Sequence, residues 1–201
     1  MKKYLFVFLL FNSYLSFSQK IKAIGLDVGS NIFPAVLGFK GFSGSILIQV
    51  DDSSNKSKIM EYIIGYASYN LNSNGLLQKN EGFFVAIGKS KKNFGWHGIF
   101  AVSGLQNTLY SIDPDFNVPY SYQFETEGII AVGADIFYEL PIKLSDKVKI
   151  NPRIELSVSI GNKPQTSKKV YYLPGFNLQA DRFFVPTFGF GLSIPVLLNL
   201  K

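Results

Sequence analysis

The sequence predicts an all-β fold, an eight-stranded antiparallel up-and-down transmembrane β-barrel that follows a cleaved signal peptide. Three observations lead to this prediction. Apolar residues alternate with small or polar ones in eight segments, the connections between these segments alternate between short and long, and the N-terminus has the composition of an export leader. Charged residues make up 17% of the 201-residue chain, below the roughly 25% typical of soluble domains.

Residues 1–18 are predicted to be the signal peptide. Lys2 and Lys3 form a charged start, Tyr4–Leu15 is mostly apolar, and Ser16–Ser18 offers small residues for cleavage before Gln19. The apolar segment is short for a membrane-spanning helix, so export with cleavage is preferred over a retained anchor. Residues 19–201 then form one barrel domain. The chain has no cysteine, which excludes disulfides and thiolate metal sites.

A hairpin between Gly128 and Gly161 carries the clearest alternation. Ile130, Val132 and Ile136 share one face of its first strand, and the pattern resumes in the second strand after a short polar turn. The same period of two residues predicts six further strands, at residues 21–30, 45–51, 59–69, 82–89, 95–105 and 183–198.

The lengths of the seven predicted connections alternate around the chain. The short ones are 52–58, 90–94 and 141–146, and the long ones are 31–44, 70–81, 106–127 and 162–182. Short turns at the periplasmic rim and long loops at the outer rim are the layout of an outer-membrane barrel. Both ends of the mature chain are therefore expected at the periplasmic rim.

The composition of the two faces decides between a membrane barrel and a soluble one. The apolar face carries far more bulky side chains than the roughly dozen that fill the interior of a closed eight-stranded barrel, so this face is predicted to meet lipid. The other face is predicted to line a narrow lumen, and a β-sandwich is the alternative fold. Because buried charges must be paired, the ionisable residues of the inner face are expected to form a hydrogen-bonded lumen network. Its members are Asp27, Glu61, Asp135, Glu139, Arg153 and Glu155.

The last predicted strand contains a local motif. Thr187–Ile194 reads polar-x-Gly-x-x-hydrophobic-x-hydrophobic. From Lys20 to its last residue the chain resembles the small eight-stranded outer-membrane barrels of the OmpA and OmpX type, without a peptidoglycan-binding domain. The resemblance implies that the assembly machinery recognises this strand. It also implies a monomer in the bacterial outer membrane, in contact with outer-membrane lipid.

No catalytic residue, cofactor or metal site is predicted. His97 is the single histidine, and its place beside a short turn puts it at the periplasmic rim, whereas outer-membrane enzymes of this size carry their catalytic groups at the outer rim. A lumen or interfacial histidine is therefore the default interpretation of His97. One histidine without cysteine disfavours a zinc site. A calcium site is an open alternative in the third long loop, although the spacing of its acidic residues matches no EF-hand. These residues are Asp113, Asp115, Glu125 and Glu127.

Basic residues gather in the fourth long loop, at Lys163, Lys168, Lys169 and Arg182. A solvated loop is the default interpretation, and contact with the phosphates of lipopolysaccharide is the alternative. A second group, Lys89, Lys91 and Lys92, is interpreted as part of a solvated periplasmic turn. The other basic residues are scattered, so nucleic-acid binding is not expected.

These features together predict an outer-membrane barrel with a filled lumen and a structural or surface-interaction role. Its long extracellular loops would meet lipopolysaccharide or an envelope protein partner. Eight strands leave no aqueous channel, so it is not expected to be a general porin. One alternative is a secreted or periplasmic all-β ligand-binding protein, which would stay monodisperse without detergent. A second is a lipid-modifying outer-membrane enzyme, which would depend on His97.

Overall fold

The computed structural model describes residues 20–31, 39–52, 58–73, 76–112, 119–123, 126–162, 176–177 and 184–200. Every regular element within these ranges is a β-strand. The described residues contain no helix that is long and apolar enough to cross a membrane. The predicted signal peptide and its cleavage site lie outside these ranges.

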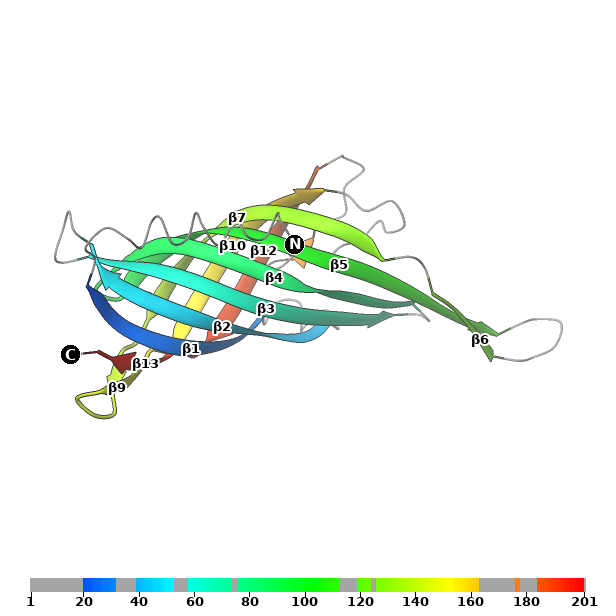
Figure 1. Cartoon of the computed structure of the whole chain (residues 1–201). Helices are drawn as coiled ribbons and strands as arrows, with labels where there is room; N and C mark the ends of the chain where they lie inside the picture. The colour runs from blue at the N-terminus through cyan, green and yellow to red at the C-terminus, as the bar shows by residue number, and fades with distance from the viewer. Residues whose placement is uncertain are drawn as a thin grey trace, which may run out of the picture.

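Eight strand positions of the described chain close into an antiparallel ring (Figure 1). Five positions are single strands: β1 (Ile21–Asn31), β2 (Phe39–Asp51), β3 (Ile59–Ser73), β4 (Leu76–Lys91) and β5 (Phe94–Ile112). Three are each extended by a short strand: β7 (Glu127–Glu139) by β8 (Ile142–Lys143), β10 (Arg153–Asn162) by β9 (Val148–Ile150), and β12 (Phe184–Ser193) by β13 (Val196–Asn199). β12 and β13 both pair with β1, which closes the ring and confirms the predicted eight-stranded barrel.

The rim opposite the short turns, where β3, β4 and β5 extend furthest, is called the long-strand rim. At this rim, several segments that were predicted as loops are strands. β3 and β4 stay paired as far as Ser73 and Leu76, inside the predicted loop 70–81. β5 continues to Ile112 and pairs with β6 (Pro119–Gln123), so both run through the predicted loop 106–127 and project from the barrel (Figure 1). In the predicted loop 162–182, β11 (Phe176–Asn177) pairs with β12. The alternation missed these extensions because strand pairing needs only backbone hydrogen bonds, and outside a membrane the outward side chains do not have to be apolar.

Three strand positions are interrupted near the short-turn rim, and two of them are the neighbours that contain β10 and β12. Asn151 and Pro152 separate β9 from β10, and Ile194 and Pro195 separate β12 from β13. The amide of Asn151 donates to the carbonyl of Pro195 at 2.8 Å, so the two breaks lie side by side. Proline removes a donor from the ladder, and placing both interruptions at one level leaves regular pairing above and below them.

Bulky apolar side chains point outward around the ring, as predicted, and the charged side chains predicted for the lumen network point inward. On β10, Leu156 is 52% exposed whereas Arg153 is 1% exposed. On β7, Val132 and Ile136 are exposed whereas Asp135 is buried. The period of two residues therefore separates two chemically different surfaces on one continuous sheet.

The interior also contains an apolar cluster, which the small residues of the inner face did not predict. Its four large members are Leu47, Ile63, Ile99 and Leu197, which pack with alanines and with the partly buried Phe84. Gly65 makes room for the Phe84 ring, because a Cβ atom at Gly65 would collide with the end of that ring. The barrel interior is therefore packed in part like an ordinary hydrophobic core.

Candidate functional site

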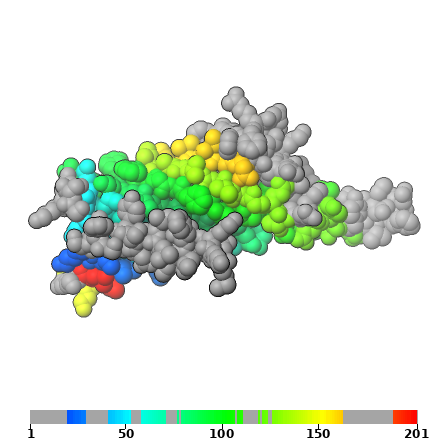
Figure 2. Space-filling view, turned by 45° about the horizontal axis from the view of Figure 1, so that its top comes forward, coloured from blue at the N-terminus to red at the C-terminus, as the bar shows by residue number. Residues whose placement is uncertain are grey.

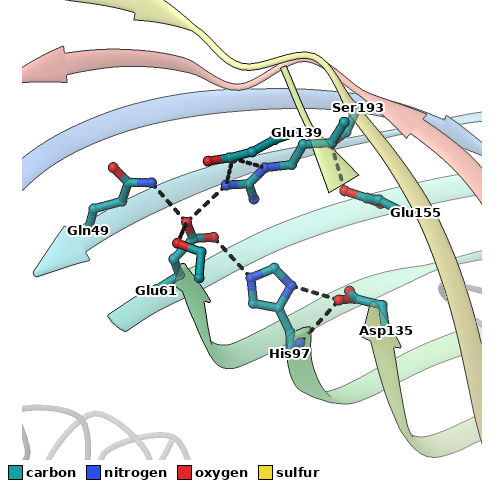
Figure 3. A network of polar contacts seen from close by, with 9 residues as sticks. Gln49, Glu61, His97, Asp135, Glu139, Glu155 and Ser193 are labelled. Atoms are coloured by element: carbon teal, nitrogen blue, oxygen red, sulfur yellow. Dashed lines mark hydrogen bonds and ion pairs between the residues drawn. The ribbon is translucent and has the colours of Figure 1, made fainter. Parts of the chain in front are cut away.

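A network of polar side chains occupies the barrel interior (Figure 3), and on β2, β3 and β5 it lies on the short-turn side of the apolar cluster. Its position follows from the strand register. Gln49, Glu61 and His97 each lie two residues from a member of the cluster on β2, β3 and β5, in the direction of the short turns. All three occupy inward positions of the alternation, so the strands themselves aim these side chains at the barrel axis.

Glu61 is the centre of this network. Its Oε1 atom accepts hydrogen bonds from Gln49 Nε2 at 2.8 Å, Ser90 Oγ at 3.1 Å and Arg153 Nη2 at 2.9 Å. Its Oε2 atom lies 3.1 Å from His97 Nε2. Glu61 is 0% exposed, and four partners replace the water that a carboxylate loses on burial.

Arg153 joins opposite sides of the lumen. Its Nε and Nη2 atoms donate to Glu139 Oε2 on the neighbouring strand β7, at 3.0 and 2.8 Å, and Nη2 also donates to Glu61. Glu61 lies on β3, four strands away from β10 in either direction around the ring. The Arg153–Glu61 ion pair therefore crosses the full width of the lumen.

His97 lies between two carboxylates. Its Nδ1 atom is 2.8 Å from Asp135 Oδ1, its Nε2 atom faces Glu61, and its backbone amide also donates to Asp135 Oδ1 at 3.2 Å. Ionised carboxylates only accept hydrogen bonds, so this arrangement suits a histidine whose two ring nitrogens both carry protons. His97 and Arg153 would then supply two positive charges among the carboxylates of Glu61, Asp135 and Glu139.

The aromatic ring of Phe137 supports both cationic side chains. It stacks on the His97 ring with a centroid distance of 4.7 Å, and the Arg153 guanidinium carbon lies 4.2 Å from its centroid. The position is available because residue 95, on the next strand, is glycine. A Cβ atom at Gly95 would collide with the Phe137 ring, so any other residue there would displace the support of the network.

Asp27 and Glu155 lie beside this network rather than within it. Glu155 accepts a hydrogen bond from Ser193 Oγ at 2.7 Å. Both acids, together with His97 and Asp135, line a cavity of about 60 Å³, which has room for a few water molecules. Asp27 Oδ1 is buried without a hydrogen-bond partner among the described residues, and it would be solvated by water in this cavity.

The geometry of the network stabilises charge. Both ring nitrogens of His97 are engaged by carboxylates, and the ring is 1% exposed. In the part of the chain that the structure describes, no group of three or more histidine, aspartate or glutamate side chains is arranged to hold a metal ion. The arrangement is therefore that of a structural ion network.

The structure places all six predicted lumen residues in the interior, and Arg153 contacts two of the others, Glu61 and Glu139, directly. Asp135 joins them through His97, which we had expected at the rim. Three strand residues separate His97 from the turn at Lys92 and Asn93, which is about 10 Å of strand, and its inward position turns it into the lumen. Alternation also marks the inward positions of Gln49 and Ser193, but no pattern indicated their partners.

Both predicted loop sites fall largely outside the described residues. Of the four acidic residues, only Glu127 is described, and it pairs with Leu105 where β7 begins. Asp113, Asp115 and Glu125 lie outside the described ranges, as do the basic residues Lys163, Lys168, Lys169 and Arg182.

No protein-family model and no curated protein matches the chain. Among solved structures, it is similar to the N-terminal β-barrel domain of OprF from Pseudomonas aeruginosa, with 9% identity, a TM-score of 0.33, and coverage of 90% of this chain and 100% of that one. It is also similar to Neisserial surface protein A (NspA), with 11% identity, a TM-score of 0.35, and coverage of 90% and 96% of the two chains. At this level of identity the likeness concerns the fold alone.

Proposed function

We propose that the chain is an outer-membrane β-barrel that is closed to solutes and presents its long-strand rim as an interaction surface. This proposal rests on the distribution of side chains, which is the reverse of that in a soluble protein: apolar side chains are outside and ionic side chains are inside. Among the described residues, 32 large hydrophobic side chains are exposed, while Arg153 and Glu61 are at most 1% exposed. Soluble monomers rarely expose a contiguous apolar patch of more than a few hundred Å², so this belt fits a hydrocarbon environment.

The height of the apolar belt fits a bilayer. On β7 and just beyond it, exposed apolar residues run from Ile130 to Leu140. Ten residue steps extend about 34 Å along a strand. With a strand tilt of about 40°, this gives roughly 25 Å along the barrel axis, the usual height of the lipid-facing band. An export leader at residues 1–18, as the sequence predicts, would deliver the chain to the outer membrane of a bacterium.

Closure of the lumen rests on the two interior layers. The Arg153–Glu61 ion pair crosses the lumen, and on β2, β3 and β5 the apolar cluster fills the interior on the side of the network away from the short turns. The cavity that both line, about 60 Å³, has room for only a few water molecules. Liposomes that contain the folded barrel should therefore swell in sugar solutions no faster than empty liposomes, and porin-like swelling would contradict closure.

The two alternative functions are less well supported. A periplasmic ligand-binding protein would have to keep the apolar belt in water. A lipid-modifying enzyme that uses His97 would need access to this residue, yet its ring is buried between Asp135 and Glu61. A structural and interaction role requires neither an apolar belt exposed to water nor an accessible His97.

The membrane placement can be tested with two arginine substitutions at different depths. Leu156 lies near the middle of the apolar belt, whereas Ile142 lies beside a short turn, and both are exposed. For the mature chain folded into liposomes, we expect Leu156→Arg to lower stability by about 2–4 kcal/mol and Ile142→Arg by about 0–1 kcal/mol. Equal effects in urea unfolding, or a mature chain that stays monodisperse in buffer without detergent, would contradict the proposal.

The interaction surface is proposed at the projecting end of β5 and β6, which continues past the barrel wall (Figure 2). From Gln106 to Ile112 and from Pro119 to Gln123 the sequence contains no charged residue, and Tyr110 and Tyr122 are more than half exposed. Exposed tyrosines are typical of contact surfaces. The partner would be an envelope protein or lipopolysaccharide, to which the basic residues 163–182 would add phosphate contacts.

In living cells, a photo-cross-linking residue at Tyr110 should give a discrete adduct with an envelope protein or with lipopolysaccharide. The same residue at Leu144, exposed at the opposite rim, is the control. Identical adduct patterns at both positions, or no adduct at Tyr110, would remove the interaction role from this surface.

A further inference from the structure

A groove lies on the outer surface of the barrel beside the short turn that joins β4 to β5. Its volume is about 360 Å³, and its lining includes the lysines Lys58, Lys89 and Lys91 together with Phe94, Trp96 and Ile136. The groove is therefore cationic where it approaches the rim and apolar where it meets the lipid-facing belt.

The strand register explains this composition. Lys89 pairs with Trp96, and Trp96 pairs with Ile136, so these three side chains form one outward row across β4, β5 and β7. In the next outward row toward the turn, Lys91 pairs with Phe94 and Phe94 pairs with Tyr138, whose ring lies 4.8 Å from that of Phe94. Each row thus combines a lysine with aromatic or aliphatic neighbours.

The whole short-turn rim is positively charged. Its described residues include three aspartates, Asp51, Asp52 and Asp146, and nine lysines, Lys20, Lys22, Lys58, Lys89, Lys91, Lys92, Lys143, Lys147 and Lys149. Each aspartate forms an ion pair with one lysine: Lys22–Asp51, Lys89–Asp52 and Lys143–Asp146. This leaves a surplus of positive charge at the rim that is expected to face the periplasm.

Within the groove, the lysines have different surroundings. Lys89 forms an ion pair with Asp52 at 3.0 Å. Lys58 and Lys91 form no ion pair with any carboxylate of the described residues, so their ammonium groups are available to an external anion. Lysine side chains of this kind rest their alkyl stems on apolar surface and hold the ammonium at the level of lipid headgroups.

We propose that this groove binds an anionic phospholipid of the periplasmic leaflet. Lys58 and Lys91 would contact the phosphate, and an acyl chain would lie along Phe94, Trp96 and Ile136. The charge complementarity selects an anionic headgroup over a zwitterionic one. The continuity of the lysines with the apolar belt selects a lipid over a free phosphate ion. This inference rests on the membrane placement proposed above.

Trp96 provides a direct probe, because it is the single tryptophan of the chain and lines the groove. The mature barrel is folded into phosphatidylcholine vesicles that contain a minor fraction of phosphatidylglycerol, with brominated acyl chains on either one lipid or the other. Bromine quenches tryptophan fluorescence only at short range. At equal mole fractions, we expect brominated phosphatidylglycerol to quench Trp96 more strongly than brominated phosphatidylcholine.

Two double variants test whether the preference for phosphatidylglycerol arises in the groove. The substitutions Lys58→Gln and Lys91→Gln together should lower the preference for phosphatidylglycerol by about fivefold for each lysine removed. The matched variant Lys143→Gln with Lys147→Gln removes the same charge from the same rim, but neither residue lines the groove. It should therefore keep the preference. Added inorganic phosphate should not displace the lipid.

The outcomes separate this inference from the proposed function. Absence of quenching by either brominated lipid would mean that Trp96 does not meet hydrocarbon, and the membrane placement itself would fail. Equal quenching by both lipids would leave the barrel in the membrane but overturn the lipid site. An equal loss of preference in the two double variants would also overturn the site, because the preference would then come from the diffuse charge of the rim. Release by inorganic phosphate would identify an anion site without lipid selectivity.

Discussion

The two layers of the barrel interior fill the same lumen by different physical means. One part of the interior is filled by an ion network around Glu61 and Arg153, and another part by an apolar cluster that includes Leu47 and Ile99. A buried ion network is stable only when every charge keeps its partner, whereas an apolar layer responds mainly to volume. The two layers should therefore react differently to substitutions that are similar in size.

Removal of a charge from the network should have the largest effect. Arg153→Met keeps much of the side-chain volume but leaves Glu61 and Glu139 buried without their shared cation. We expect a loss of about 3–5 kcal/mol of stability, measured by urea unfolding of the barrel in liposomes. The triple variant Arg153→Met, Glu61→Gln and Glu139→Gln should recover most of this loss, because it leaves no unpaired charge among these three positions. A triple variant as unstable as the single one would show that packing, rather than charge pairing, dominates in this layer.

Truncation in the apolar layer should have the next largest effect. Leu47 is 0% exposed, and Leu47→Ala should cost about 3 kcal/mol through lost contacts and a residual cavity. Leu47→Met retains the volume and should cost less than about 1.5 kcal/mol in the same unfolding assay. If the two variants were equally unstable, the stability of the apolar layer would depend on side-chain shape and not only on volume. The proposed difference between this layer and the ion network would then be wrong.

A glycine substitution that links strand packing to the network should have the smallest effect. In Gly95→Ala, the new methyl group would press on the Phe137 ring, which supports His97 and Arg153, and we expect a cost of about 1–3 kcal/mol. Gly98 is the control on the same strand, because the nearest atom to its Cβ position is the Ile87 carbonyl oxygen at 3.8 Å. Gly98→Ala should therefore be neutral or slightly stabilising. A thermal scan of both variants in detergent would compare them directly.

The polar network shows what the alternation of apolar and polar residues in the sequence can predict and what it cannot. The alternation indicates which residues face the lumen, and it placed Glu61, Asp135 and Arg153 there. It does not indicate which of them meet, since Arg153 and Glu61 are 92 positions apart in sequence and on opposite strands of the ring. Their contact depends on the tilt and stagger of the strands, which are properties of the closed sheet. The interpretation of His97 as a lumen histidine agrees with the structure, but its predicted position at the rim was wrong for a related reason: closeness to a turn in sequence does not measure depth in a tilted barrel.

The sequence by itself determined the all-β class, the number of strands and the face that points outward. The reason is that a sheet with lipid on one side and a narrow lumen on the other imposes a period of two residues on every strand. Only the tertiary structure decided the strand extensions at the long-strand rim, which rely on backbone pairing alone. It also decided the partners of the lumen charges and the groove that Lys58, Lys91 and Trp96 line together. These features arise when distant strands become neighbours, and a local pattern carries no information about which strands will do so.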